Sequence, residues 1–296
     1  MNSVDQQQNP GQLSDHARIA HRPGAADVDT LRRALAPWRF LTDPRFHGLE
    51  NIPASGAVLL VGNHTTFGLL DAPLMIEQIY RERGRFVRGL ADHVHYLIPG
   101  WRELLTRAGA ARGTRDNCRA LLAAGEAVLV YPGGGREVAK RKNEKYQLIW
   151  QQRTGFARLA IEAGCPIVPF GAVGAEDSYD ILFDADHPTL APIRGLVERF
   201  GGRWDIIPPI PRGIGPTPLP RPERFYFAFG NPIDTTQWAG RTDDHTIATA
   251  RDLVRDAVND RIAFLLTEQA ADPGRHLLNR ARWRTTAPSS EEHSAG

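Results

Sequence analysis

Five consecutive apolar residues at positions 57–61 (AVLLV) constrain the fold of this chain more than any other feature. A run without polar alternation predicts a strand that is buried on both faces, as in parallel sheets. The chain turns at residues 62–63 (GN) and presents His64, and a helical pattern begins at Asp71. Because ligands bind at the carboxyl ends of strands in open α/β sheets, this junction predicts a functional site with His64 and Asp71.

Two interpretations of His64 and Asp71 stay open at this point. In the structural one, Asp71 is the N-cap of a helix with Pro73 in its first turn, and His64 only makes hydrogen bonds within its loop. In the functional one, the two residues form an acid/base pair. A helix over residues 64–71 would separate them by about 10 Å along its axis. The pair therefore requires a loop over residues 64–70 that folds His64 back towards the carboxylate.

Further apolar runs alternate with helical patterns along the chain. We predict an edge strand and turn within 46–53, strands at 85–90, 127–131, 166–173 and 225–230, and helices that follow them at residues 114–125 and 155–163. A last helix is expected over about 246–269, with an apolar stripe that includes Leu253 and Val254. This alternation predicts an α/β protein with a mostly parallel central sheet flanked by helices.

The expected organisation is a single α/β domain over residues 31–271 between two polar, disordered tails, 1–30 and 272–296. Residues 188–222 break the rhythm because they combine Pro and Gly with large apolar residues and arginines. Two interpretations remain for them. They are either a long loop packed over the core, or a lid or membrane-facing insertion whose apolar side chains enter the headgroup boundary.

Composition limits the function classes. The net charge of +2 gives no argument for nucleic acid, and no zinc-finger spacing occurs. Two cysteines, Cys118 and Cys165, fit a reducing compartment without a disulfide framework or a metal site. No run approaches the ~18 apolar residues of a spanning helix, and the polar first 30 residues lack a secretory core. We expect a cytoplasmic protein, peripheral on the inner face of the membrane.

The carboxyl ends of three predicted strands would converge in a parallel sheet. The first carries His64 and Asp71, the second residues 133–137 (GGGRE), and the third residues 174–177. Consecutive glycines allow backbone N–H groups to approach an anion, or they only make a tight turn; Arg136 directly after them favours a phosphate or carboxylate ligand. Residues 140–145 (KRKNEK) are either a solvated basic face or a segment that attracts an anionic substrate.

The ordered segments at residues 62–71 (GNHTTFGLLD), 130–137 (VYPGGGRE), 141–146, 155–160, 164–170 and 174–180 resemble the glycerolipid and lysophospholipid acyltransferase superfamily. Within it, the monoacylglycerol/diacylglycerol acyltransferase-like branch is most similar. The resemblance covers about residues 45–235. It implies a glycerol-3-phosphate acyltransferase-like fold and an acyl-thioester-dependent O-acyltransferase at a membrane.

By this resemblance His64 is the general base, Asp71 orients it, and Arg136 meets the phosphate or polar head of the acceptor. Six residues separate His64 from Asp71 where the family has four, and Gly133 replaces the usual glutamate, which favours a neutral acceptor. The general chemistry is consistent: a neutral imidazole removes the hydroxyl proton, and glycine N–H groups stabilise the oxyanion. The absence of a Gly-x-Ser-x-Gly elbow argues against a serine hydrolase.

The sequence therefore predicts transfer of a fatty acyl group from acyl-CoA or acyl carrier protein to a hydroxyl of a glycerolipid or other lipid alcohol. The alternatives are a thioesterase or lipid hydrolase, and a catalytically inactive lipid-binding protein. We expect no cofactor beyond the thioester co-substrate, no metal and no nucleic acid. Substrate contacts are expected from Asn63, Gly133, Gly134, Gly135, Arg136, Glu137 and Lys142.

Overall fold

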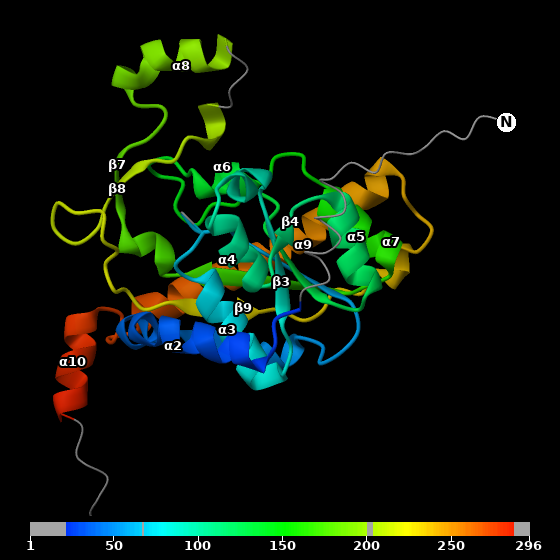
Figure 1. The fold of residues 1–296 in the computed structure, drawn as a ribbon, viewed down its shortest axis with the longest axis horizontal. Helices are drawn as coiled ribbons and strands as arrows, with labels where there is room; N and C mark the ends of the chain where they lie inside the picture. Colours follow the sequence, from blue (N-terminus) through cyan, green and yellow to red (C-terminus); the bar gives the residue numbers. More distant parts are fainter. Residues whose placement is uncertain (1–21, 67, 200–203, 287–296) are drawn as a thin grey trace, which may run out of the picture.

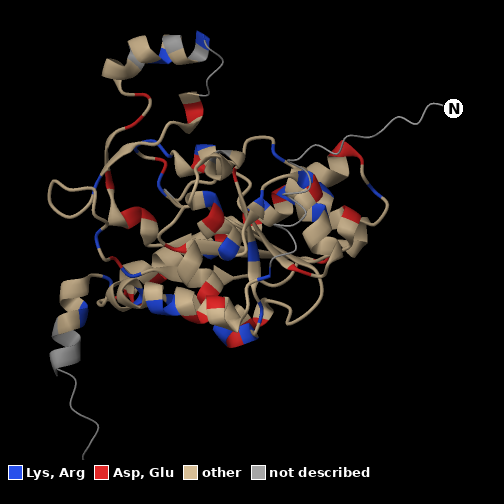
Figure 2. Cartoon of the chain, viewed as in Figure 1, with Lys and Arg blue, Asp and Glu red and all other residues tan. Residues whose placement is uncertain are grey.

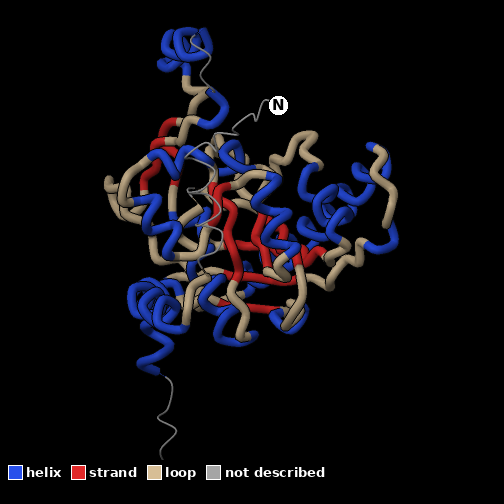
Figure 3. The backbone as a smooth tube through the Cα atoms, turned by 45° about the vertical axis from the view of Figure 1, so that its right-hand side comes forward, coloured by secondary structure: helices blue, strands red, loops and turns tan. Residues whose placement is uncertain are grey.

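The structure is a computed structural model that describes residues 22–66, 68–199 and 204–286. At its centre lies a seven-stranded sheet with the order β1-β9-β6-β2-β5-β3-β4 (Figure 3). Its strands are β1 Arg45–His47, β2 Val58–Gly62, β3 Val87–Ala91, β4 Ala111–Arg112, β5 Ala127–Val130, β6 Ile167–Val173 and β9 Tyr226–Phe229.

All adjacent strands of this sheet pair in parallel except β6 and β9. The run at 57–61 becomes β2, the fourth strand of the seven, and all five residues of β2 are buried. Burial on both faces explains why its sequence shows no polar alternation. The predicted edge strand is β1, which pairs only with β9. The predicted fold class is confirmed.

Helices cover both faces of the sheet. Val58 and Leu60 of β2 pack with α3 and α2, whereas Leu59 and Val61 pack with α5, α7 and α9. The two core clusters thus follow from the two-residue period of the strand. The α-helices are α2 Ala25–Thr42, α3 Ala72–Arg83, α4 Trp101–Arg107, α5 Arg115–Ala123, α6 Gly134–Val138, α7 Gly155–Ala163, α8 Ala191–Arg199, α9 Asp244–Ala271 and α10 Leu277–Thr286.

The last predicted helix corresponds to α9, which extends beyond both of its predicted ends. Asp243 caps its N-terminus by accepting from the N–H of Thr246. Its predicted apolar stripe is wrong at Leu253, which is 47% exposed. Arg251 is buried instead and donates to the carbonyl of Gln151. The aliphatic part of the Arg251 side chain therefore packs towards the core while its guanidinium is hydrogen-bonded. A prediction that counts leucine as buried and arginine as exposed is wrong for both residues.

The predicted limits of the two tails do not fit the structure. Helix α2 begins at Ala25, inside the expected N-terminal tail, and α10 lies inside the expected C-terminal tail. Asp272 is also buried, where it accepts hydrogen bonds from Arg224 and the hydroxyl of Tyr226. Polar composition misled the prediction because these charged residues satisfy one another inside the protein. Residues 1–21 and 287–296 lie outside the described residues.

The segment 188–222 is not a loop over the core. Strands β7 Asp180–Phe183 and β8 Ile210–Arg212 form a separate antiparallel pair, and α8 lies beyond them, away from the body of the protein (Figures 1 and 3). We call residues 180–199 and 204–212 the arm. It exposes Phe183, Ile193 and Ile210. Trp204 is buried by contrast and donates to the carbonyl of Ala185.

Two surface properties bear on function. Acidic and basic side chains are interspersed over the helices and loops (Figure 2), in keeping with the net charge of +2. Among the described residues, no helix combines the length and the apolar character that crossing a membrane requires.

Candidate active site

The parallel pairing of β2 with β5 and with β6 brings the three predicted strand ends together. The backbone N–H of His64, after β2, donates to Glu137 Oε2, after β5, at 3.1 Å. Asn63 joins β2 to β6: its side-chain amide donates to and accepts from the backbone of Ala172 at 2.9 and 2.8 Å. Asn63 is buried and both its polar atoms are engaged, so the predicted substrate contact from Asn63 is not supported by this geometry.

The His64 ring is held between an aromatic face and a glycine. It stacks on Tyr131 with ring centroids 4.0 Å apart, and a Cβ added to Gly68 would lie 2.0 Å from its Cε1 atom. Gly68 has φ +61° and belongs to the predicted loop before α3. Burial, followed by the charges of Lys140 and His95, lowers the pKa of His64 to about 3. The imidazole is therefore neutral at physiological pH.

Asp71 caps α3, as the structural interpretation predicted. Its Oδ1 atom accepts from the N–H of Ala72 at 2.8 Å and from the hydroxyl of Thr65 at 3.0 Å. Burial raises the pKa of Asp71 to about 6, although both hydrogen bonds oppose the shift. Among the described residues, no hydrogen bond joins the ring of His64 to Asp71. The acid/base pair therefore stays a prediction.

Glu137 was predicted to touch the substrate, but its side chain is fully buried. Besides His64, it accepts from the N–H of Ile149 at 3.3 Å, so it ties the His64 loop to the segment after α6. Burial raises the pKa of Glu137 to about 7, against the influence of Lys140 and of the two backbone donors. A Cβ on Gly133 would lie 2.3 Å from Glu137 Oε2. Gly133 therefore leaves room for this carboxyl group.

Gly134, Gly135 and Arg136 belong to the short helix α6, which is separated from β5 by residues 131–133. Gly134 has φ +49°, and Gly135 approaches Ile206 of the arm. Arg136 forms a two-pronged ion pair with Glu144, with N–O distances of 2.9 and 2.5 Å. Its guanidinium, predicted to meet the acceptor, is thus engaged within the protein.

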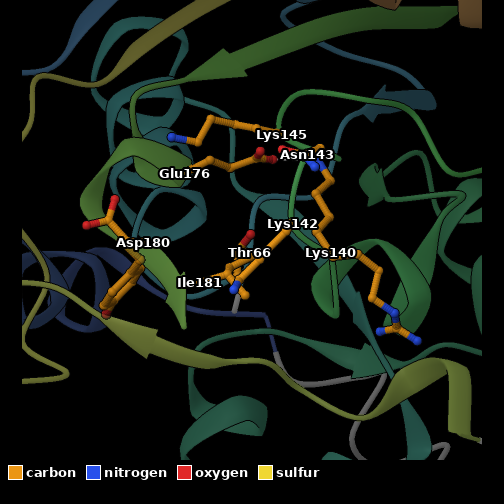
Figure 4. A pocket seen from close by; sticks show the side chains of 10 residues that line it. Thr66, Lys140, Lys142, Asn143, Lys145, Glu176, Asp180 and Ile181 are labelled. Carbon is orange, nitrogen blue, oxygen red and sulfur yellow. Dashed lines mark hydrogen bonds and ion pairs between the residues drawn. The ribbon is translucent and has the colours of Figure 1, made fainter. Parts of the chain in front are cut away.

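The basic segment 140–145 is not simply a solvated face. The ammonium of Lys140 is 1% exposed and forms an ion pair with Glu176 at 2.5 Å. Lys142 is exposed and lines a pocket of about 260 Å³ together with Thr66, which follows His64 by two positions (Figure 4). Among the described residues, no group of three or more His, Cys, Asp or Glu side chains is placed to hold a metal ion.

Sequence reasoning found the strand ends but missed several partners at the site. The sequence predicts no individual role at the site for Tyr131, Glu176 or Thr66, although Tyr131 ends an apolar run and so lies at the carboxyl end of a predicted parallel strand. These residues become visible only when β2, β5 and β6 lie side by side.

Comparison with known proteins finds similarity to one family over part of the chain. Residues 43–173 match the model of the acyltransferase family. The 1-acyl-sn-glycerophosphate acyltransferase PlsC of Thermotoga maritima has a similar fold, with a TM-score of 0.50 and 16% identity over 86% of this chain and 88% of that chain. The segment 43–173 is therefore similar to the acyltransferase family, in agreement with the resemblance of the ordered motifs.

Two individual proteins with known names are similar in sequence to this chain. Phytyl ester synthase 2 of Arabidopsis thaliana, a chloroplastic protein, is 34% identical over 82% of this chain. The human DGAT1/2-independent enzyme synthesizing storage lipids is 33% identical over 50% of this chain. The chain spans 37% of the length of the plant relative and 48% of the human one.

Proposed function

We propose that this chain is an O-acyltransferase that moves a fatty acyl group from a thioester to the hydroxyl of a lipid alcohol, with His64 as general base. The observation that carries the proposal is the position of His64 beyond the carboxyl end of the central strand β2, in the loop that leads to Asp71 at the start of α3. The acyltransferase family model over residues 43–173 and the names of the two relatives support the reaction class.

In the proposed reaction, the acceptor hydroxyl gives its proton to His64 while its oxygen attacks the thioester carbon. The new C–O bond forms, the C–S bond breaks, and the departing thiolate takes the proton from the imidazolium. A carboxylate that contacts the ring would stabilise this imidazolium. Because catalytic hydrogen bonds often tighten only when substrate binds, the proposal requires the loop 64–70 to bring His64 and Asp71 together in the substrate complex.

We propose a neutral lipid alcohol as the acceptor. The Arg136–Glu144 ion pair supports this choice, because a guanidinium held by a carboxylate in two hydrogen bonds is not free to bind an acceptor phosphate. The name phytyl ester synthase supports it as well, since it describes ester formation on a neutral alcohol in that relative.

We also propose peripheral attachment to a membrane, which supplies lipid acceptors to the site. The arm supports this, because it carries exposed Phe183, Ile193 and Ile210 away from the body of the protein. Apolar side chains of this kind insert at the boundary between headgroups and acyl chains.

Incubation of the protein with radiolabelled acyl-CoA, with acyl carrier protein thioester in parallel, and with mixed lipid alcohols tests the function. We expect labelled ester that depends on the alcohol and disappears in His64→Ala. Free fatty acid that forms equally without any alcohol would indicate a thioesterase, and vesicle binding without either product would indicate a lipid-binding protein. Near-normal ester formation by folded His64→Ala would remove the general-base role.

A further inference from the structure

One aromatic contact sets the plane of the His64 ring. The ring stacks on Tyr131 with centroids 4.0 Å apart and planes inclined by 16°. Its two nitrogens make no hydrogen bond to any residue that the structure describes. In this part of the chain, the orientation of the imidazole therefore depends on the face of Tyr131 and on the close approach of Gly68.

Tyr131 is itself held from the side of the core. Its ring meets the ring of Phe170 in β6 edge-on, with centroids 6.0 Å apart and planes at 71°. Phe170 is fully buried, and a Cβ on Gly62 would lie 2.4 Å from its Cζ atom. The packed core thus restrains the ring of Tyr131, which presents a fixed face to His64.

The part of Tyr131 that can act on His64 is the ring and not the hydroxyl. The hydroxyl makes no hydrogen bond to a described residue. Burial, followed by the charges of Asp71 and Glu137, raises the pKa of Tyr131 well above its ordinary value, so the phenol is neutral. The face of such a ring carries partial negative charge and attracts a cation that lies over it.

We propose that Tyr131 is a positioning residue of the acyl transfer, whose ring holds the His64 imidazole and stabilises the imidazolium that forms in the reaction. The inference rests on the proposed function, in which His64 takes the proton of the acceptor hydroxyl. Burial disfavours the charged form of a histidine. No hydrogen bond or ion pair joins the ring to a described carboxylate, so the stacked face of Tyr131 is the contact that offsets this cost.

Stacking also leaves the edge of the imidazole accessible. Both nitrogens direct their lone pair or N–H in the plane of the ring, so a contact with the face occupies neither of them. Such a contact resists tilting of the ring more than rotation within its plane. His64 can therefore turn towards Asp71 and an acceptor hydroxyl while it stays stacked on Tyr131, as the proposed reaction requires.

Steady-state turnover separates the ring from the hydroxyl. Tyr131→Phe should keep kcat within about twofold, because it retains the aromatic face. Tyr131→Leu should lower kcat about tenfold and change KM less than about twofold. Tyr80→Leu is the matched control, since Tyr80 in α3 is also a half-buried tyrosine that packs edge-on against a phenylalanine, Phe86. Equal kcat values for Tyr131→Leu and Tyr80→Leu would overturn the inference.

A substitution that preserves the shape of the ring covers the case in which Tyr131→Leu does not fold. Replacement of Tyr131 by pentafluorophenylalanine keeps a stacking ring but reverses the charge distribution over its face. We expect this replacement to lower kcat as Tyr131→Leu does, with KM unchanged. Wild-type kcat in this variant would overturn the stabilisation of the imidazolium.

Proton NMR of the histidine ring signals tests the stack without acyl transfer. Protons over an aromatic face resonate upfield, and the signal that is missing from His64→Ala identifies His64. We expect an upfield shift in the wild type and in Tyr131→Phe that is lost in Tyr131→Leu, and an unshifted wild-type signal would overturn the stack. An intact stack in a protein that forms no ester would instead refute the proposed function, so the two failures give different results.

Discussion

The buried carboxyl group of Glu137 makes stability depend on pH in the direction opposite to that of an ion-paired carboxylate. Its pKa is raised from 4.5 to about 7 in the folded protein. Such a group contributes stability that is fully present below the unfolded pKa and is lost as pH rises through the folded value. The difference between 4.5 and about 7 corresponds to about 3 kcal/mol. The free energy of unfolding should therefore fall by about this amount between pH 4.5 and 7 through Glu137 alone.

Glu137→Gln isolates this effect. The new amide N–H₂ opposes the N–H of His64 or of Ile149, which costs about 1–3 kcal/mol at every pH. Because only the wild type loses stability as Glu137 ionises, the deficit of the variant should shrink by about 3 kcal/mol between about pH 5 and pH 8.

Urea unfolding at the two pH values measures this difference, with Glu82→Gln on the exposed face of α3 as the control. The pKa of Asp71 is also raised, but Asp71 titrates in both proteins, so its contribution to the pH dependence of the free energy of unfolding cancels in the difference between them. A deficit of Glu137→Gln that is the same at both pH values would refute the burial argument.

Two further predictions concern the site and the thiols. Gly68→Ala should lower kcat/KM at least about tenfold, because its Cβ would lie 2.0 Å from the His64 ring. Gly56→Ala is the control: Gly56 also has a positive φ, but a Cβ there would have nothing within 4 Å, so this variant should keep full activity. Equal losses of kcat/KM in the two variants would contradict this placement of His64. Burial raises the pKa of Cys118 to about 12 and of Cys165 to about 11, so both should react with a disulfide reagent at about pH 8 only after unfolding, and fast reaction of the native protein would contradict this.

Most of the sheet could be predicted because its strands carry continuous apolar runs. The strand predicted at 127–131 corresponds to β5, and the helix predicted at 155–163 coincides with α7, which ends at Gly164 with φ +59°. The arm could not be predicted in the same way. Strands β7 and β8 are short and mostly exposed, so they lack an apolar run, and their pairing depends on contacts between segments about 30 residues apart.

The location of the candidate site was predictable, whereas the state of its side chains was not. Parallel strands place their carboxyl ends at one edge, so His64 and the glycine segment had to meet there. Tertiary contacts decide which polar groups are already hydrogen-bonded. Asn63 is bonded to Ala172, 109 residues away, and the N–H of His64 donates to Glu137, 73 residues away. Residue type alone cannot tell a polar side chain that binds substrate from one that satisfies the backbone.

Gly133 shows how the same residue supports different conclusions from sequence and from structure. In the sequence, the missing glutamate at this position suggested a neutral acceptor. In the structure, a Cβ at position 133 would lie 2.3 Å from Glu137 Oε2, so no larger side chain fits while Glu137 supports the backbone of His64. Packing is therefore sufficient to explain Gly133, and this glycine carries no information on acceptor charge. A neutral acceptor is supported instead by the Arg136–Glu144 ion pair, which is independent of position 133.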